Sequence, residues 1–153
     1  IDGLKEKNGF KQVGSVWTET YSLKFGYIGV TRPHIRLTTK SSISTLHMQH
    51  GRTYGVSYNP IINNQEEHLL SLINLENVTN KFFIYNSIDG KTNSKKFFSI
   101  NPYSSKLINL KNNLKNNKNK FIKANFFIEH DGILRRNIII RNVKNNITSM
   151  DHI

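Results

Sequence analysis

Short runs in which apolar and polar residues alternate with a period of two dominate the chain. The clearest pair lies in residues 81–100, where aromatic-rich runs at 82–85 and 97–100 flank a polar segment containing Asp89-Gly90. Aromatic and β-branched residues favour strands, and Asp-Gly favours the positive φ of a tight turn. The stretch therefore predicts a β-hairpin. Its polar segment is longer than a two-residue turn, so we expect an extended or irregular tip, with the paired aromatic runs at the centre of the core.

The same alternation recurs along the chain. The odd-numbered positions of residues 15–27 are mostly apolar, which predicts one long amphipathic strand. Turn signals, including His130-Asp131-Gly132, separate the later runs. Further strands are expected at residues 34–39, 51–58, 68–75, 105–110, 121–129 and 137–143.

About eight short strands with little helix predict an all-β protein, specifically an antiparallel β-sandwich of the jelly-roll or immunoglobulin-like type. The length of 153 residues suits one domain with a real core and is too short for two comfortable ones. We expect a single domain over 1–153, with a possible internal connection at the polar, asparagine-rich residues 61–67. The low-complexity residues 111–120 predict a solvated loop.

Composition narrows the classes of protein. Nine Phe, six Tyr and one Trp supply a bulky core, while the absence of Cys removes disulfides, a thiol nucleophile and cysteine-based zinc sites. No run of about 18 apolar residues occurs, so neither a transmembrane helix nor membrane insertion is expected. The compartment stays undetermined. A start at Ile1, without Met or an apolar leader, favours a processed product or a fragment.

A formal net charge of +12 suggests a polyanionic partner. The abundance of Lys, Asn, Ile and Phe is also what an AT-rich genome encodes, and we favour that explanation of the charge. If the charge is functional, phosphate contacts would give sequence-independent, salt-sensitive binding. Exposed aromatics for base stacking are not expected, because the Phe residues are assigned to the core. The candidate polyanion-binding residues are Lys95, Lys96, Lys111, Lys115, Lys118 and Lys120.

Local motifs of catalysis are missing from the sequence. It contains no glycine-rich phosphate loop, no GxSxG nucleophile elbow and no HExxH zinc helix. Glu19, on the apolar face of the strand expected at 15–27, is the one acid whose burial could raise its pKa for general acid–base work. An ion pair with an arginine or a place at a strand edge is the favoured explanation of Glu19. The balance is against an enzyme, and no cofactor is expected.

The histidines leave a metal site as a further hypothesis. His47 and His50 stand three residues apart, and His130 is followed directly by Asp131. Imidazole and carboxylate suit zinc, iron or manganese. On a strand, a spacing of three places two side chains on opposite faces, so a shared metal would require a turn or bulge. We favour unrelated surface or turn histidines.

The sequence thus favours a non-catalytic binding or assembly module, an accessory or structural domain of a larger protein or complex. A protein partner or self-assembly is the expected mode of action. The alternatives are a nucleic-acid or polyanion-binding domain that uses the basic C-terminal half, and a metal-dependent enzyme with a His/Asp site.

Overall fold

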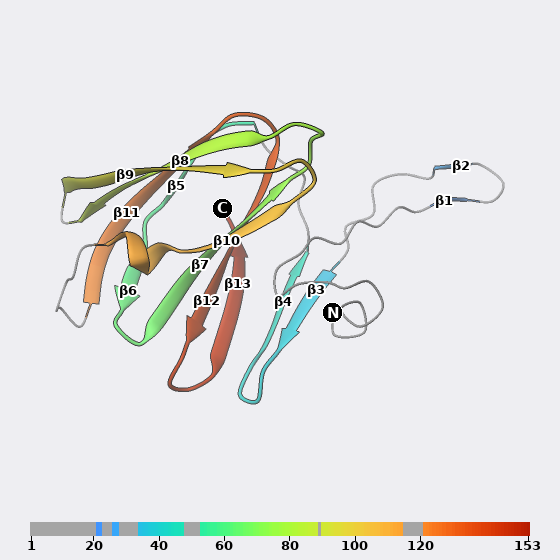
Figure 1. Cartoon of the computed structure of the whole chain (residues 1–153). Helices are drawn as coiled ribbons and strands as arrows, with labels where there is room; N and C mark the ends of the chain where they lie inside the picture. The colour runs from blue at the N-terminus through green and yellow to red at the C-terminus, as the bar shows by residue number, and fades with distance from the viewer. Residues whose placement is uncertain (1–20, 23–25, 28–33, 48–52, 89, 115–120) are drawn as a thin grey trace.

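A computed structural model describes residues 21–22, 26–27, 34–47, 53–88, 90–114 and 121–153 of the chain (Figure 1). Within these ranges the protein is all-β, with a single 3-10 turn and no α-helix, as the alternation predicts. The strands of the first half are β1 (Tyr21–Ser22), β2 (Gly26–Tyr27), β3 (His34–Thr38), β4 (Ile43–His47), β5 (Val56–Tyr58), β6 (Ile61–Asn63) and β7 (Glu66–Asn74). Those of the second half are β8 (Asn80–Ile88), β9 (Lys91–Ile100), β10 (Ser105–Asn109), β11 (Phe121–His130), β12 (Leu134–Asn142) and β13 (Ile147–His152), and the 3-10 turn η1 (Leu110–Asn113) follows β10.

Two antiparallel sheets make up most of the described chain (Figure 1). One has the strand order β10-β7-β12-β13. The other has the order β5-β11-β8-β9, and β6 pairs with β11 beyond β5 along the same edge. The chain crosses repeatedly between the sheets, so strands that follow one another in sequence are often not hydrogen-bonded partners. The segment 61–67 contains β6 and the start of β7, which leaves only Asn64 and Gln65 between these two strands.

The facing sides of the two sheets share one hydrophobic core. Burial alternates strictly along β11, where Ile122, Ala124, Phe126 and Ile128 point inward. Leu70 and Leu72 of β7 contribute from the opposite sheet. The alternation places every second side chain of a strand on one face, so β11 buries one set of residues and exposes the other. The remaining core residues include Ile62, Phe82, Ile84, Ile100, Ile108, Leu110, Leu134 and Ile138.

The predicted hairpin at 81–100 is confirmed, and its tip is tighter than expected. β8 and β9 pair from Asn80↔Ile100 to Ile88↔Lys91, so only Asp89 and Gly90 separate the two strands. Gly90 has a φ of +77°, the conformation that glycine adopts without strain. A register shift at Asn86/Ser87 accommodates the polar residues that sequence alone assigned to an irregular tip. The polar segment is therefore strand.

The strand expected over 15–27 is not continuous in its described part. Tyr21 pairs with Tyr27 and Ser22 with Gly26 in antiparallel fashion, so the chain reverses direction between β1 and β2. Period-two alternation indicates extended backbone but carries no information about where a strand bends back, which explains the error. Glu19 lies outside the described residues.

Serine hydroxyls attach the β3–β4 hairpin to the free edge of β13. The Ser42 Oγ accepts from the Thr148 N–H at 2.8 Å, and the Ser44 Oγ accepts from the Met150 N–H at 2.9 Å. The Thr39 hydroxyl donates to the Asn146 carbonyl at 2.6 Å. Side chains here bond the outward-facing backbone groups that an edge strand would otherwise present to another chain.

Candidate binding face

The outer face of the β9-β8-β11 sheet carries a set of aromatic and charged side chains. On β11 the odd-numbered residues are exposed and include Phe121, Lys123, Phe127 and Glu129. The register aligns Phe127 with Tyr85 of β8, and Glu129 with Phe83. On the other side of β8, Phe83 aligns with Phe97 and Tyr85 with Lys95. Because aligned residues of neighbouring strands point to the same side, these side chains form one surface.

Four rings form a continuous diagonal row across the three strands. The centroids of Phe97 and Phe83 are 5.3 Å apart, those of Phe83 and Tyr85 6.3 Å, and those of Tyr85 and Phe127 6.1 Å. The end members are the most accessible, Phe97 at 55% and Phe127 at 44% exposure. We call this row and its charged neighbours Lys81, Lys95, Lys123 and Glu129 the aromatic–lysine face.

Lys95 lies at the centre of the aromatic–lysine face. Its Nζ is 4.2 Å from the centroid of the Phe83 ring and 4.9 Å from that of the Tyr85 ring. Cation–π attraction of this kind is worth about 0.5–1 kcal/mol at an exposed site. The Tyr85 hydroxyl donates to the Glu129 carboxylate at 2.7 Å. These contacts hold the ammonium group between the two rings, with Phe97 and Phe127 free of it on either side.

These rings correct the expectation that the aromatic runs form the core. Phe82 and Phe98 do point inward and stack at 5.0 Å, but their sequence neighbours Phe83 and Phe97 point outward. A signal was present in the sequence: the odd positions of 121–130 hold Lys123, Asn125 and Glu129, which mark that face as the solvent side. Phe127 shares their parity and is therefore outward.

The lysines proposed from sequence as a polyanion patch do not gather at one place in the described structure. Lys95 and Lys96 are adjacent on β9, and their side chains emerge on opposite faces of the sheet. Lys111 is the second residue of η1, and its ammonium donates to the Asn64 carbonyl. Lys115, Lys118 and Lys120 lie outside the described residues. Lys81 and Lys123, which sequence analysis did not select, share the outer face with Lys95.

The histidine of the expected His/Asp pair is buried between structural partners. The Nε2 atom of His130 lies 3.1 Å from the Arg136 Nη1 atom, and its Nδ1 atom lies 3.2 Å from the Gly132 carbonyl oxygen. A guanidinium can only donate, so Nε2 accepts and Nδ1 carries the proton. Burial, and then the charge of Arg136, lower the pKa of His130. A metal ion at this imidazole would have to displace one of these contacts, while Asp131 next to it is exposed.

A second buried histidine connects the two sheets. The Tyr58 hydroxyl, from β5, lies 2.6 Å from the Nδ1 atom of His68, on β7, and the Glu66 carboxylate lies 3.6 Å from its Nε2 atom. Burial lowers the pKa of His68, although Glu66 acts in the opposite direction. Burial raises the pKa of Tyr58 to about 12, with added contributions from the charges of Asp151 and Glu66.

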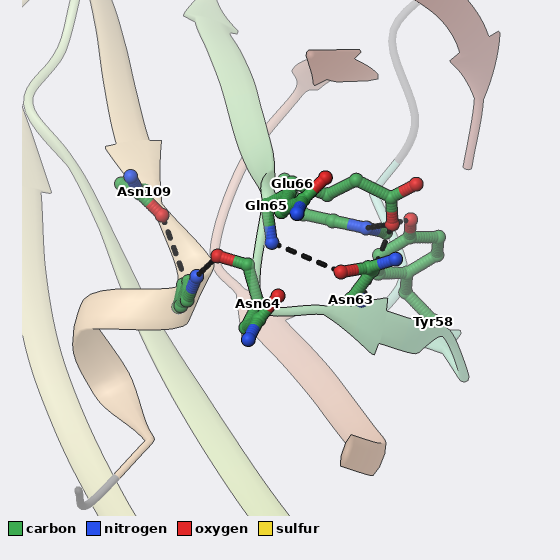
Figure 2. Close-up of polar contacts among 8 residues, drawn as sticks. Tyr58, Asn63, Asn64, Gln65, Glu66 and Asn109 are labelled. Carbon is green, nitrogen blue, oxygen red and sulfur yellow. Dashed lines mark hydrogen bonds and ion pairs between the residues drawn. The ribbon is translucent and has the colours of Figure 1, made fainter. Parts of the chain in front are cut away.

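The turn between β6 and β7 positions this cluster (Figure 2). The Asn63 side chain accepts from the Gln65 N–H at 3.0 Å, and the Glu66 carboxylate accepts from the Asn63 N–H at 3.2 Å. The Asn109 side chain accepts from the Lys111 N–H at the start of η1. The Asn63 N–H thus holds the Glu66 carboxylate near His68, and the Tyr58–His68 pair is a partly buried structural link.

Among the residues that the structure describes, no group of three or more His, Asp or Glu residues is placed to hold a metal ion. The side chain of His47 and all of His50 lie outside the described part, so the metal hypothesis stays a prediction for those two residues. No helix among the described residues is long and apolar enough to cross a membrane.

Comparison with known proteins gives evidence on the fold alone. No family model and no curated protein matches the chain. A solved structure, the crystal structure of Thermotoga maritima 1070, is similar over 66% of this chain and 90% of its own, with a TM-score of 0.53 and 15% sequence identity. Its similarity supports an all-β architecture and carries no information about activity.

Proposed function

We propose that this chain is a non-catalytic binding or assembly module that contacts its partner through the aromatic–lysine face. The observation that carries the proposal is the contiguous row of four rings on a sheet surface, with Phe97 and Phe127 about half exposed. Exposed apolar patches rimmed by polar residues are typical of interaction sites. Aromatic residues concentrate binding energy because they bury large areas with little loss of side-chain freedom.

The chemistry of the titratable residues supports binding over catalysis. Both ring nitrogens of His130 contact structural partners, and His68 is buried beneath Tyr58. A general base must reach a substrate proton within hydrogen-bond distance. The buried position of each imidazole argues against such a role.

We propose further that the fold is a β-sandwich of the jelly-roll type, formed by one domain. Support comes from three nested antiparallel pairs among the described strands: β8 with β9, β7 with β10, and β5 with β11. In a jelly roll such nested pairs roll up into two sheets, which also brings β8 beside β11 and β7 beside β12. Both of those pairings are present, whereas an immunoglobulin-like sandwich would pair β12 with β11.

Native mass and co-purifying material test the function. We expect the wild-type protein to elute either above the mass of one chain or together with a bound partner, and a Phe97→Ser/Phe127→Ser variant to lose this behaviour. Leu107→Ser is the matched control, because Leu107 is 40% exposed on β10 of the other sheet. A wild-type protein that runs as a clean monomer and binds no offered macromolecule would overturn the proposal.

A further inference from the structure

We propose that the aromatic–lysine face binds single-stranded nucleic acid, with bases stacked on Phe97 and Phe127 and phosphates at Lys81, Lys95 and Lys123. This inference rests on the proposed function, because it names the ligand of the same face. Three features carry it: the separation of the two exposed rings, the excess of positive charge, and the path that the lysines follow across the sheet.

The two accessible rings are spaced so that each can take a base of its own. Phe97 and Phe127 lie on strands separated by β8, and the register offsets them by two residues along the strand direction. Ordinary sheet spacings then place their Cα atoms roughly 12 Å apart. Phe83 and Tyr85 fill the interval and hold the Lys95 ammonium. Every base has a π-face, so stacking on such rings tolerates any sequence.

The charges on the face are complementary to a phosphate backbone. The face carries three ammonium groups, from Lys81, Lys95 and Lys123, and one carboxylate, that of Glu129. The Glu129 carboxylate accepts a hydrogen bond from the Tyr85 hydroxyl. Asp131 lies just past the end of β11. Cation–π contact leaves the charge of Lys95 intact, so its ammonium can still attract a phosphate. The net charge of +12 for the whole chain would draw any nucleic acid toward the molecule.

The lysines follow the row of rings from end to end. Lys81 aligns with Ser99, two residues along the strand from the Phe83–Phe97 pair. Lys95 aligns with Tyr85, in the middle of the row of rings. Lys123 lies on β11 past the Phe127 end, opposite Ile61. A strand of nucleic acid lying along this path would meet a phosphate site before, between and after its two stacked bases.

An unpaired strand fits this face better than a duplex. In a duplex the base faces are covered by their neighbours, so surface rings cannot reach them without unstacking. Open sheets that bind single-stranded RNA use aromatic side chains on adjacent strands to stack two or three bases. The outer face described here has the same elements: neighbouring strands, exposed rings and flanking cations.

Fluorescence anisotropy with labelled oligo-dT and oligo-U of about 15 nucleotides tests the proposal. We expect binding whose log Kd rises with log salt at a slope of about 2, since three lysines each contribute about 0.7 on single strands. Phe97→Ala and Phe127→Ala should each weaken binding about 5- to 150-fold. Lys123→Ala should lower the slope by about 0.7. A duplex of the same length should bind more weakly.

Matched controls separate this face from general charge. Leu107→Ala removes an exposed apolar side chain from the other sheet, and Lys144→Ala removes an exposed lysine from the β12–β13 turn. Neither substitution should remove the part of the binding affinity that comes from bases stacked on Phe97 and Phe127. Phe97→Leu removes the ring and keeps an apolar side chain, so it decides the matter if Phe97→Ala fails to fold.

The inference is overturned if neither oligonucleotide binds at low salt, or if Phe97→Ala and Phe127→Ala both bind as tightly as the wild-type protein. The native-mass experiment distinguishes that failure from failure of the proposed function. Self-association or a protein complex that disappears in the Phe97→Ser/Phe127→Ser variant, without oligonucleotide binding, would refute nucleic acid as the ligand and leave the binding module standing. If neither the association nor oligonucleotide binding is observed, the binding module and the nucleic-acid ligand are both refuted.

Discussion

The Tyr58 hydroxyl and the His68 Nδ1 atom, 2.6 Å apart, form a hydrogen bond between strands of different sheets. Tyr58 belongs to β5 at the edge of one sheet, and His68 belongs to the central strand β7 of the other. The bond joins two partners that are ten residues apart in sequence and whose strands do not pair. It is one of several polar links between the two sheets, together with His130–Arg136 and Asn80–Asn74.

Removal of this hydroxyl should destabilise the protein. Tyr58→Phe leaves a buried nitrogen without its partner, so we expect the free energy of unfolding in urea to fall by about 1–3 kcal/mol. Tyr54→Phe is the control, since Tyr54 is well exposed and its change should stay within about 0.5 kcal/mol. Equal stability of the two variants would show that the bond contributes nothing.

Tyr58 should lose its hydroxyl proton at a higher pH than an ordinary tyrosine does. Its pKa of about 12, against an ordinary 10.0, means that the unfolded chain loses this proton first as pH rises. The contribution to stability is therefore complete below pH 10 and is lost as pH rises toward 12. Tyrosinate absorbance of the folded protein should show one late component that is absent from Tyr58→Phe. An unchanged titration in that variant would contradict the assignment.

Acid should destabilise the protein through its two buried histidines. The pKa values of His68 and His130 are lowered from 6.5, chiefly by burial. Below pH 6.5 the unfolded state binds more protons than the folded state, so the free energy of unfolding falls as pH falls. Each histidine contributes a slope of up to about 1.4 kcal/mol per pH unit. Urea unfolding from about pH 8 to 5 should show a shallower slope for His130→Gln than for wild type.

Two glycines with similar backbone angles should respond very differently to alanine. Gly90 has a φ of +77° and open space where a Cβ atom would stand, whereas Gly132 has a φ of +67° and a Cβ there would lie 2.1 Å from the Glu76 Oε2 atom. Gly90→Ala should cost about 1–2 kcal/mol, the strain of the left-handed conformation. Gly132→Ala should cost more.

The extra cost at Gly132 comes from the polar network that it approaches. The Glu76 carboxylate accepts from the Ile133 N–H at 2.6 Å and from the Asn80 side chain at 2.9 Å, and Asn80 donates also to buried Asn74. A methyl group would break at least one of these bonds. Thermal unfolding of both variants checks the prediction, and equal losses would contradict it.

Two aromatics of the hairpin that point to opposite faces should differ in their effect on stability. Phe82 is fully buried and Phe97 is 55% exposed. Phe82→Ala should lower the free energy of unfolding by about 3–5 kcal/mol, because it leaves a cavity in the core. Phe97→Ala should cost well under half of that, since its ring is largely in water. A large loss from Phe97→Ala would show that the row of rings is buried in the folded protein.

Much of the fold was predictable because a strand repeats every two residues. The alternation in 121–130 and the Asp89-Gly90 turn are local properties, and both the strand and the hairpin are present. The face that each run buries was harder to assign where two aromatics are adjacent. In Phe82-Phe83 one ring must point inward and the other outward. The polar residues of β8 do not decide which, because Lys81 and Ser87 share the parity of Phe83 while Asn80 and Asn86 share that of Phe82.

By itself, the sequence determined that the chain forms antiparallel strands separated by tight turns, because period and turn chemistry act over a few residues. The tertiary structure decided which strands pair, since pairing brings together residues far apart in the chain. Phe97 and Phe127 belong to one row of rings because β8 lies between their strands and pairs with both. It also decided that His130 faces Arg136 and that His68 faces Tyr58. The aromatic–lysine face exists only once three strands share one register.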